Sequence, residues 1–374
     1  MIRFESVTKR YPDGTVAVDS LSLVADSGEI TVFVGPSGCG KTTSLRMINR
    51  MIEPTSGSIF IDDQDVTKVS RTELRRGIGY VIQHAGLFPH RTVVDNVATV
   101  PLLLGHDKKK ARTRALELLE LVGLPASMAK RYPAQLSGGQ QQRVGVARAL
   151  AANPPVMLMD EPFSAVDPVV RAQLQQEFLR LQQELHKTIV FVTHDIDEAI
   201  KLGDRVAVLQ VGGHLAQLAT PAELLAHPAD AFVAGFVGRD RGYRALGFAD
   251  AGQMPLLAEP TAQLGWDLAK ARDVAVDGWV LVTDAEQMPL GWLRLEGLSD
   301  SALSGQVTEA SLNLGGTLAV QGGTLRALLD AALSSPSGRG VVVDDDGHFL
   351  GTVTASEVLE RIQQRTPVAR GDAG

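Results

Sequence analysis

The chain has 374 residues, enough for two or three domains of ordinary size. A hydrophobic content of 44% and a charged content of 21% are typical of a globular protein and exclude a disordered one. No apolar run approaches the ~18 residues of a membrane span, and residues 1–5 do not have the pattern of a signal peptide.

The net charge of −7 is unevenly distributed along the chain. Residues 1–240 contain 26 Lys and Arg against 26 Asp and Glu, whereas residues 241–374 contain 10 against 17 and so carry the whole excess. This step predicts a domain boundary near residue 240, followed by an acidic accessory module. The acidic balance argues against nucleic acid as a partner of that module.

Residues 2–34 have the pattern of short strands, with a turn at residues 12–14. Tyr11 lies just before this turn, where its ring is placed either to stack on a purine or to fill the core. Residues 57–83 repeat the pattern of strands and turns.

A glycine-rich segment follows the apolar run at residues 30–34. Residues 35–42, Gly-Pro-Ser-Gly-Cys-Gly-Lys-Thr, fit the pattern G-x-x-x-x-G-K-[ST], and a helix-compatible run comes next. The glycines let the backbone wrap an anion, so that N–H groups and the positive end of a helix point at phosphate oxygens. We expect Lys41 to reach the β- and γ-phosphates and the Thr42 hydroxyl to hold Mg²⁺. The chain is therefore predicted to bind a nucleoside triphosphate.

Residues 107–122 have helical periodicity, and we expect the basic residues 108–112 at their start to form a solvated face. The run Leu-Ser-Gly-Gly-Gln at residues 136–140 then opens a second helical segment, which continues to Ala151.

Two apolar strands end in polar residues. Residues 156–159 lead to Asp160 and Glu161, and residues 188–193 lead to His194. An acid at the end of a buried strand beside a phosphate site commonly holds Mg²⁺, which favours this role for Asp160. Glu161 is placed to orient a water and accept its proton, unless it is a second metal ligand or a surface acid. Strands that alternate with helices predict a parallel α/β sheet with its site at the carboxyl edge.

Taken together, five motifs in one order make residues 1–240 resemble an ABC (ATP-binding-cassette) transporter ATPase. Residues 136–140 match the signature sequence of that family letter for letter. The resemblance implies an α/β P-loop NTPase fold with a parallel-sheet core, an antiparallel β subdomain and a helical subdomain. It also implies ATP and Mg²⁺ as cofactors and ATP hydrolysis as the reaction.

The resemblance assigns a role to each motif residue. Around the nucleotide, Tyr11 stacks on adenine, Thr43 continues the helix of the phosphate loop, and the loop itself consists of Gly35, Pro36, Ser37, Gly38, Cys39, Gly40, Lys41 and Thr42. Around the metal and the attacking water, Asp160 holds Mg²⁺, Gln83 touches Mg²⁺ and the water, Glu161 is the base, and His194 senses the γ-phosphate. Across the dimer, Asp167 signals to the other subunit, and Ser137 and Gly139, with Gln140 beside them, cap the γ-phosphate of the opposite subunit. Taken without the other motifs, His194 would be better explained as a hydrogen-bonded histidine at a strand end. Because each motif occurs once, the resemblance implies a homodimer of cassettes with two-fold symmetry.

Two segments are similar to importers for quaternary amines such as glycine betaine, proline betaine and choline. They are residues 78–90 and residues 232–238. This similarity implies separate integral-membrane permease subunits, an external substrate-binding protein that acts through them, and a peripheral place on the cytoplasmic face of the inner membrane. Leu87, Phe88 and Pro89 are then expected to contact a permease coupling helix, the alternative being packing inside the helical subdomain. The lone Cys39 excludes an intrachain disulfide and fits a reducing cytoplasm.

Residues 241–374 contain two copies of one pattern. Each copy has an apolar strand, an acidic turn and a second strand, within repeats at about 255–300 and 308–366. This resembles a small α+β tandem of CBS modules, which implies regulation by a small ligand. Glu357 stands where nucleotide-binding modules usually have Asp, which puts AMP or ATP in doubt and leaves a cyclic dinucleotide, an ionic-strength response or plain dimerisation open.

All three tryptophans, Trp266, Trp279 and Trp292, lie in this tail. An aromatic cage for a quaternary ammonium is one interpretation. Large rings that fill the core of a small module are the better one.

The expected function is the ATPase of an importer for a quaternary amine or similar osmolyte. One alternative keeps the ATPase and changes the cargo to an amino acid, choline or an ergothioneine-like betaine. Another is a soluble cassette protein that acts without a permease, which would usually have two tandem cassettes or a coiled-coil insertion, and a basic face.

Overall fold

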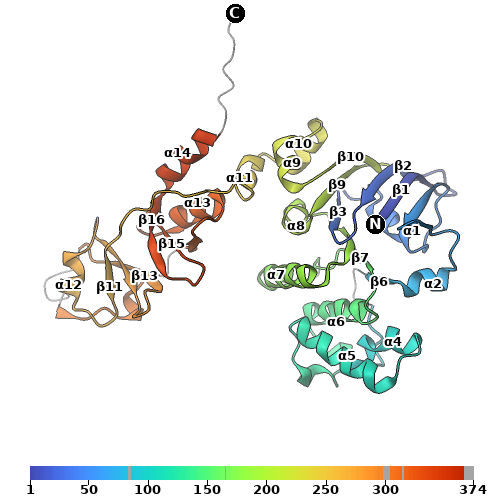
Figure 1. Cartoon of the computed structure of the whole chain (residues 1–374), viewed down its shortest axis with the longest axis horizontal. Coiled ribbons are helices and arrows are strands. Elements are labelled where there is room, and N and C mark those ends of the chain that lie inside the picture. The colour runs from blue at the N-terminus through green and yellow to red at the C-terminus, as the bar shows by residue number, and fades with distance from the viewer. Residues whose placement is uncertain (83–85, 165, 298–303, 314–315, 366–374) are drawn as a thin grey trace, which may run out of the picture. The chain divides into compact units, whose positions relative to one another are not determined.

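The computed structural model spans residues 1–374 and describes all of them except 83–85, 165, 298–303, 314–315 and 366–374. The chain forms two compact units, residues 1–239 and residues 240–374 (Figure 1). The boundary lies beside the position at which the charge balance changes. In the described part of the chain, no helix has the length and apolar character needed to cross a bilayer.

The first unit is built on a six-stranded sheet with the strand order β10-β9-β3-β8-β7-β6. Its strands are β3 (Ile30–Val34), β6 (Ile78–Val81), β7 (Val156–Asp160), β8 (Thr188–Val192), β9 (Arg205–Gln210) and β10 (His214–Ala219). All but β10 run parallel. Every residue of β3, β7 and β8 is buried, which explains why their sequences are continuous apolar runs. Because these three strands are neighbours, the segments that follow them meet at one edge of the sheet.

Helices pack on this sheet. They are α1 (Lys41–Ile48), α2 (Arg71–Arg76), α7 (Pro168–Leu185), α8 (Ile196–Leu202), α9 (Pro221–Ala226) and α10 (Ala231–Val237). Helix α1 packs against β7 and β8, α8 against β3, and α2 against β6. Asp167 and Asp195 begin α7 and α8 as N-caps, each accepting hydrogen bonds from backbone N–H groups of its helix.

A four-stranded antiparallel sheet with the order β2-β1-β4-β5 lies beside the main sheet. It consists of β1 (Ile2–Arg10), β2 (Val16–Ala25), β4 (Ser56–Ile61) and β5 (Gln64–Asp65). Phe4 of β1 meets Phe33 of β3 edge-to-face, with 6.1 Å between ring centroids. This buried pair joins the two sheets in one core.

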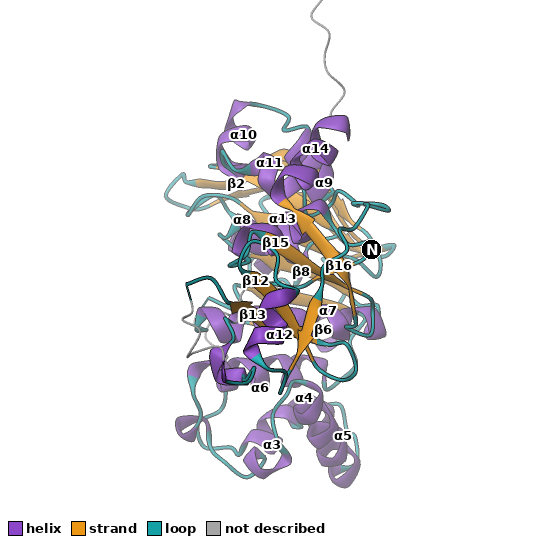
Figure 2. Ribbon diagram, turned by 90° about the vertical axis from the view of Figure 1, so that its left-hand side faces the viewer, coloured by secondary structure: helices purple, strands orange, loops and turns teal. Residues whose placement is uncertain are grey.

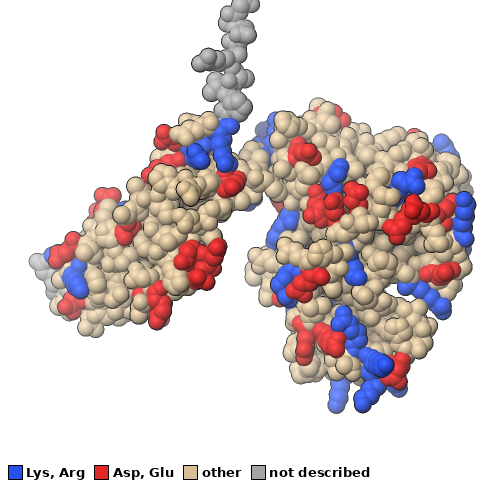
Figure 3. Space-filling model, viewed as in Figure 1, with Lys and Arg blue, Asp and Glu red and all other residues tan. Residues whose placement is uncertain are grey.

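A helical subdomain follows β6 and lies at the end of the first unit away from the antiparallel sheet (Figure 2). Its elements are α3 (Val93–Val97), α4 (Thr99–Leu103), α5 (Lys108–Leu121), α6 (Gly138–Leu150) and the 3-10 turns η1 (Ala126–Met128) and η2 (Pro133–Gln135). Helices α3, α5 and α6 pack on one another. Residues 108–110 at the start of α5 are exposed, and basic side chains gather over this subdomain (Figure 3), as the sequence predicts. The expected parallel core, antiparallel subdomain and helical subdomain are thus confirmed.

The second unit contains two three-stranded sheets of the same design. One comprises β11 (Thr261–Gln263), β12 (Trp279–Thr283) and β13 (Pro289–Arg294), and the other β14 (Ala319–Val320), β15 (Arg339–Val343) and β16 (Phe349–Thr354). In each sheet the first two strands are parallel and the last two antiparallel. The pairing of Val280 with Leu293 recurs as the pairing of Gly340 with Val353, so both partners advance by 60 residues. The remaining elements are α11 (Arg241–Ala245), α12 (Leu268–Asp273), η4 (Glu309–Ser311), α13 (Leu325–Ser334) and α14 (Ala355–Arg365).

The two repeats of this unit are interlocked. Leu257, just before the strands of the first repeat, bridges to Thr352 of the second, while Asn313, just before the strands of the second, bridges to Trp292 of the first. Trp292 is only 1% exposed and packs between the sheets, in one cluster with Leu281 and two valines of β15. The Trp292 ring therefore packs in the core, the interpretation that the sequence favoured over an aromatic cage.

Candidate functional site

The segment between β3 and α1 forms a tight loop in which two of the glycines have no room for a side chain. Gly35 and Gly40 have φ angles of +154° and +89°, and a Cβ atom on either would lie 2.2 Å from a backbone oxygen, that of Leu209 or Ala17. The chain can therefore make this loop only with glycine at both positions. Helix α1 begins at the next residue, Lys41, so the loop wraps around the positive end of the helix.

Lys41 is buried inside this loop. Its Nζ atom donates hydrogen bonds to the backbone oxygens of Gly35 at 2.7 Å and Pro36 at 2.9 Å. The ammonium group is thereby held where a phosphate in the loop would meet it, and phosphate oxygens can replace the two carbonyl groups as its partners.

Asp160 and Thr42 bring two oxygen ligands together at the end of β7. The Thr42 hydroxyl donates to Asp160 Oδ1 at 2.9 Å, and Asp160 is 3% exposed. Burial raises the pKa of the Asp160 carboxyl, against the opposing effects of Thr42 and the nearby Arg46 guanidinium. A carboxylate and a hydroxyl at the mouth of a phosphate loop are the donor set that Mg²⁺ prefers, so these residues fit the expected metal.

Glu161 and His194 face each other across the ends of β7 and β8. His194 Nδ1 lies 3.2 Å from Glu161 Oε1. Glu161 has a φ of +46°, a left-handed conformation that costs a non-glycine residue about 1–2 kcal/mol. Its N–H group donates to the Val192 oxygen at 2.9 Å, and this bond between the two strand ends holds the strained residue in place.

The phosphate loop, Glu161 and His194 line one open cavity of about 560 Å³, a size that suits a small-molecule site, and Asp160 lies outside its walls. Its walls are residues 35–43, Glu161, His194, Ala17 and Phe236. The sequence analysis did not predict Ala17 or Phe236. Phe236 belongs to α10 and lies in the segment 232–238 that is similar to quaternary-amine importers, but neither this similarity nor its spacing from Phe232 places it at the nucleotide site.

Other residues expected at the site lie outside this cavity. Tyr11 is half-buried in the turn after β1, with the Lys9 ammonium 5.3 Å from its ring centroid. Ser137 begins α6 in a capping box with Gln140, whose backbone N–H donates to Ser137 Oγ at 3.3 Å. Gly139, in the first turn of α6, and Asp167, the N-cap of α7, do not line the cavity either. Gln83 lies outside the described residues.

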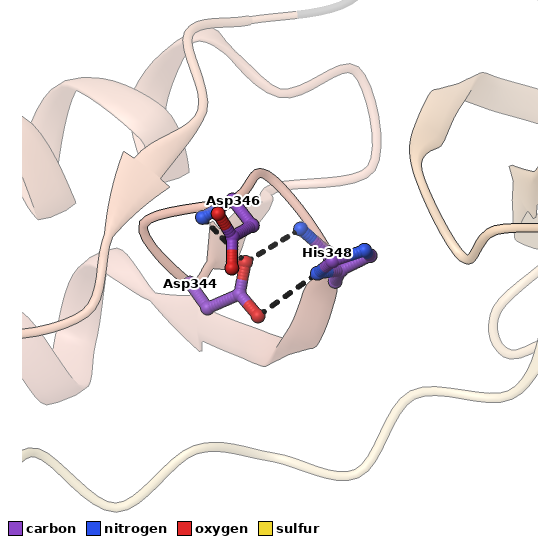
Figure 4. A group of neighbouring side chains, drawn as sticks. All are labelled: Asp344, Asp346 and His348. Atoms are coloured by element: carbon purple, nitrogen blue, oxygen red, sulfur yellow. Dashed lines mark hydrogen bonds and ion pairs between the residues drawn. The ribbon is translucent and has the colours of Figure 1, made fainter.

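A separate cluster in the second unit joins Asp344, Asp346 and His348 within 4.8 Å (Figure 4). Asp344 Oδ1 accepts from the backbone N–H groups of the other two residues, at 3.0 and 2.8 Å. Asp284 makes the same pair of bonds, to Glu286 and Met288, in the first repeat, where no histidine is present. The cluster is therefore explained as the turn between two strands.

Comparison with known proteins identifies the cassette. The family described as "ABC transporter" matches residues 18–164. The chain is 42% identical over 369 residues to the glycine betaine/carnitine/choline transport ATP-binding protein OpuCA of Bacillus subtilis, with 96% of each chain covered. It is also 42% identical over 371 residues to the osmoprotectant import ATP-binding protein OsmV of Salmonella typhimurium, again with 96% of each chain covered.

Among solved structures, a dimeric ATP-binding cassette in a post-hydrolysis state bound to ADP and Pi is 37% identical, with a TM-score of 0.55. It covers 59% of this chain and 99% of its own. Relatives of this identity over 96% of both chains, together with a phosphate loop, Glu161 and His194 in one cavity, show that the chain belongs to the ATP-binding subunits of ABC transporters, which are Mg²⁺-dependent ATPases.

Proposed function

We propose that this chain powers the uptake of glycine betaine or a related quaternary amine through separate membrane subunits. The likeness to OpuCA carries this proposal, because it covers 96% of the chain and so includes the second unit as well as the cassette. A different cargo, such as choline, an amino acid or an ergothioneine-like betaine, would leave the same ATPase role. A soluble cassette protein without a permease has no support in these relatives.

Hydrolysis at this site depends on charge neutralisation and on the placement of a water. Lys41 contacts the β- and γ-phosphate oxygens, and Thr42 and Asp160 hold Mg²⁺, which offsets phosphate charge when bound. Glu161 orients the attacking water and accepts its proton. His194, at 3.2 Å from Glu161, is placed to contact the γ-phosphate and the carboxylate together.

We assign Ser137 and Gly139 to the site of a second copy of the chain. They lie at the N-terminus of α6, a helix of 13 residues whose positive end suits phosphate, yet they do not line the cavity of their own chain. A homodimer of cassettes supplies each cavity with this helix end. The dimeric state of the solved cassette bound to ADP and Pi supports this arrangement.

The permease is proposed to dock on the loop before α3. Phe88 is 40% exposed there, beside Leu87 and Pro89, and the Arg91 guanidinium lies 5.1 Å from its ring centroid. Fully buried Asn96 shapes this loop, because it accepts from the Phe88 N–H at 2.7 Å and its amide donates to three carbonyl oxygens of the loop. An exposed aromatic residue on a loop held this firmly suits a hydrophobic partner. The chain would then lie on the cytoplasmic face of the membrane and meet an external binding protein only through the permease.

The second unit is proposed to be a CBS-like regulatory pair that takes a small ligand. A cavity of about 190 Å³ lies between its repeats, lined by Leu281, Trp292, Leu318, Val341 and four neighbouring residues. Thr354 and Glu357 are engaged in a capping box at the start of α14, with the Thr354 hydroxyl 2.8 Å from Glu357 Oε2. Nucleotide-binding CBS modules usually hold a ribose with a Ser or Thr and an Asp at these two positions. The mutual engagement of Thr354 and Glu357 argues against that contact and favours a ligand other than an adenine nucleotide.

Co-purification from gently solubilised membranes tests the proposal. A tagged Glu161→Gln protein, expected to persist as an ATP-bound dimer, should bring down an integral permease. Adding Phe88→Asp should remove the permease, whereas adding Leu103→Asp should not, because Leu103 is a 69% exposed apolar residue of the same subdomain outside the loop. Recovery of ribosomes, or of no membrane protein, would contradict the transport role.

A further inference from the structure

A chain of buried polar side chains lies behind His194, outside the nucleotide cavity. Glu198, Gln175 and Thr193 are 7%, 6% and 2% exposed, respectively. Burying polar groups, and above all a carboxylate, costs free energy unless each is hydrogen-bonded. Apolar residues of similar size would fill this space at a lower cost in free energy, so the hydrogen bonds of the network indicate why polar residues are present here.

The network connects two helices. Gln175 of α7 donates from Nε2 to Glu198 Oε1 of α8 at 3.0 Å. The Gln175 amide oxygen in turn accepts from Lys201 Nζ at 2.9 Å. Gln175 therefore holds the carboxylate through one end of its amide and a cation through the other. Burial raises the pKa of Glu198, and the hydrogen bonds from Thr193 and Gln175 oppose that rise.

The network ends at the residue before His194. The Thr193 hydroxyl accepts from the Asp195 N–H at 3.0 Å and lies beside the Glu198 carboxylate, where it opposes the rise in the pKa of that carboxyl. The Thr193 hydroxyl thus spans His194, because it belongs to the residue before the histidine and accepts a hydrogen bond from the residue after it. The Thr193 N–H donates to the Phe33 oxygen at 3.1 Å, which ties the same point to β3, the strand that leads into the phosphate loop.

The His194 side chain itself is 63% exposed, and among the described residues its polar contact is with Glu161, at 3.2 Å. An exposed ring has few neighbours to fix it, so its position depends on the backbone that carries it. That backbone is held from behind by Thr193 and Glu198.

We propose that Glu198 is a positioning residue for ATP hydrolysis, which acts through Thr193 to fix His194 against Glu161. The inference rests on the proposed role of His194. This role gives α7 a part in catalysis, because Gln175 of that helix holds Glu198. Helix α7 begins at Asp167, the residue expected to signal across the dimer. The phosphate loop lies outside the network, so ATP binding does not depend on it.

Steady-state ATPase assays on the full chain test the inference through the separation of kcat from KM. Thr193→Val is isosteric and removes only the hydroxyl, and Glu198→Gln keeps the shape but alters the bonding. We expect both variants to lower kcat by roughly tenfold, the scale of one lost buried hydrogen bond, with the KM for ATP unchanged. Thr193→Ser restores the hydroxyl and should restore kcat.

Gln182→Ala is the matched control. Gln182 is a buried glutamine of the same helix, and its amide donates to the Gly28 and Lys187 oxygens, away from His194. We expect this variant to lower the melting temperature and to keep the parent kcat. A parent-like kcat for Thr193→Val, or a fall in kcat for Gln182→Ala equal to that for Glu198→Gln, would overturn the inference.

His194→Ala separates this inference from the proposed function. If His194→Ala lowers kcat and Thr193→Val does not, only the positioning role fails. If His194→Ala itself keeps the parent kcat, the role of His194 fails and the inference fails with it.

Discussion

Lys41 is the residue whose charge matters most for ATP binding. Its ammonium is 7% exposed and already held in the loop, at 2.7 Å from the Gly35 oxygen. Lys41→Ala deletes this charge, so that within the loop the phosphates face backbone N–H groups without a side-chain cation. We expect ATP affinity to fall at least roughly a hundredfold, since several charge-assisted hydrogen bonds are lost. Isothermal titration with Mg-ATP measures this, and an unchanged Kd would contradict the role of Lys41.

Glu161 separates binding from hydrolysis. Glu161→Gln preserves shape and the contact to His194 but cannot accept a proton. We expect ATP binding at the parent affinity and a fall in kcat of roughly a thousandfold or more, with an ATP-bound dimer accumulating. Gel filtration with ATP, alongside an ATPase assay, tests both halves. Turnover at the parent rate would show that another group is the base.

The sequence predicts these residues because each stands at a fixed distance from a strand end. The glycines of the phosphate loop, Asp160 and Glu161 need only the pattern of one strand and its loop. Ala17 and Phe236 could not be predicted as wall residues, since they approach the loop from elements far away in the chain. The left-handed backbone of Glu161 could not be predicted from the local sequence either, because the pairing of β7 with β8 holds this residue in place.

At the scale of elements, the helix starts are predictable and the contacts between elements are not. Helix α7, Pro168–Leu185, begins where Asp167 and Pro168 form a strong N-terminal signal in the sequence. The strand repeats of the tail are also visible as two similar runs. Their interlocking depends on single bridges, Leu257 to Thr352 and Asn313 to Trp292, which have no sequence pattern of their own.

A buried ion pair joins the two repeats of the second unit. Arg339 Nε of β15 lies 2.9 Å from Glu259 Oε2, with side-chain exposures of 10% and 4%, and the Arg339 guanidinium lies 5.0 Å from the Trp292 ring centroid. Removing Glu259 leaves the buried Arg339 guanidinium with only the exposed Asp277 carboxylate, 3.7 Å from its Nη1 atom, as a counter-ion. We expect Glu259→Leu to lower the free energy of unfolding of this unit by about 3–5 kcal/mol.

The double variant Glu259→Leu/Arg339→Met is the control for this prediction. It removes both charges, so the loss should be much smaller than that of Glu259→Leu alone. Calorimetry on the full chain measures both variants. Equal losses in the two would mean that the pair contributes packing rather than compensated charge.

For the whole molecule, the division into two units allows catalysis and regulation to be separated. The cavity that holds the phosphate loop, Glu161 and His194 is lined entirely by residues 1–239. Removing residues 240–374 should therefore leave basal ATPase activity intact and abolish any response to a ligand of the second unit. The assay is hydrolysis by the truncated and full chains at matched concentration. Complete loss of activity would make the second unit structural rather than regulatory.

Uptake in cells is the measurement that tests the central claim most directly. Cells that lack their own copy of this chain are supplied with the parent or with Glu161→Gln, and the entry of labelled glycine betaine, choline and carnitine is followed. The account predicts that the parent restores uptake of at least one of these amines and that Glu161→Gln, although present at the same level, restores none. Uptake restored by Glu161→Gln, or no uptake of any of these amines with the parent, would contradict the claim that ATP hydrolysis by this chain drives the import of a quaternary amine.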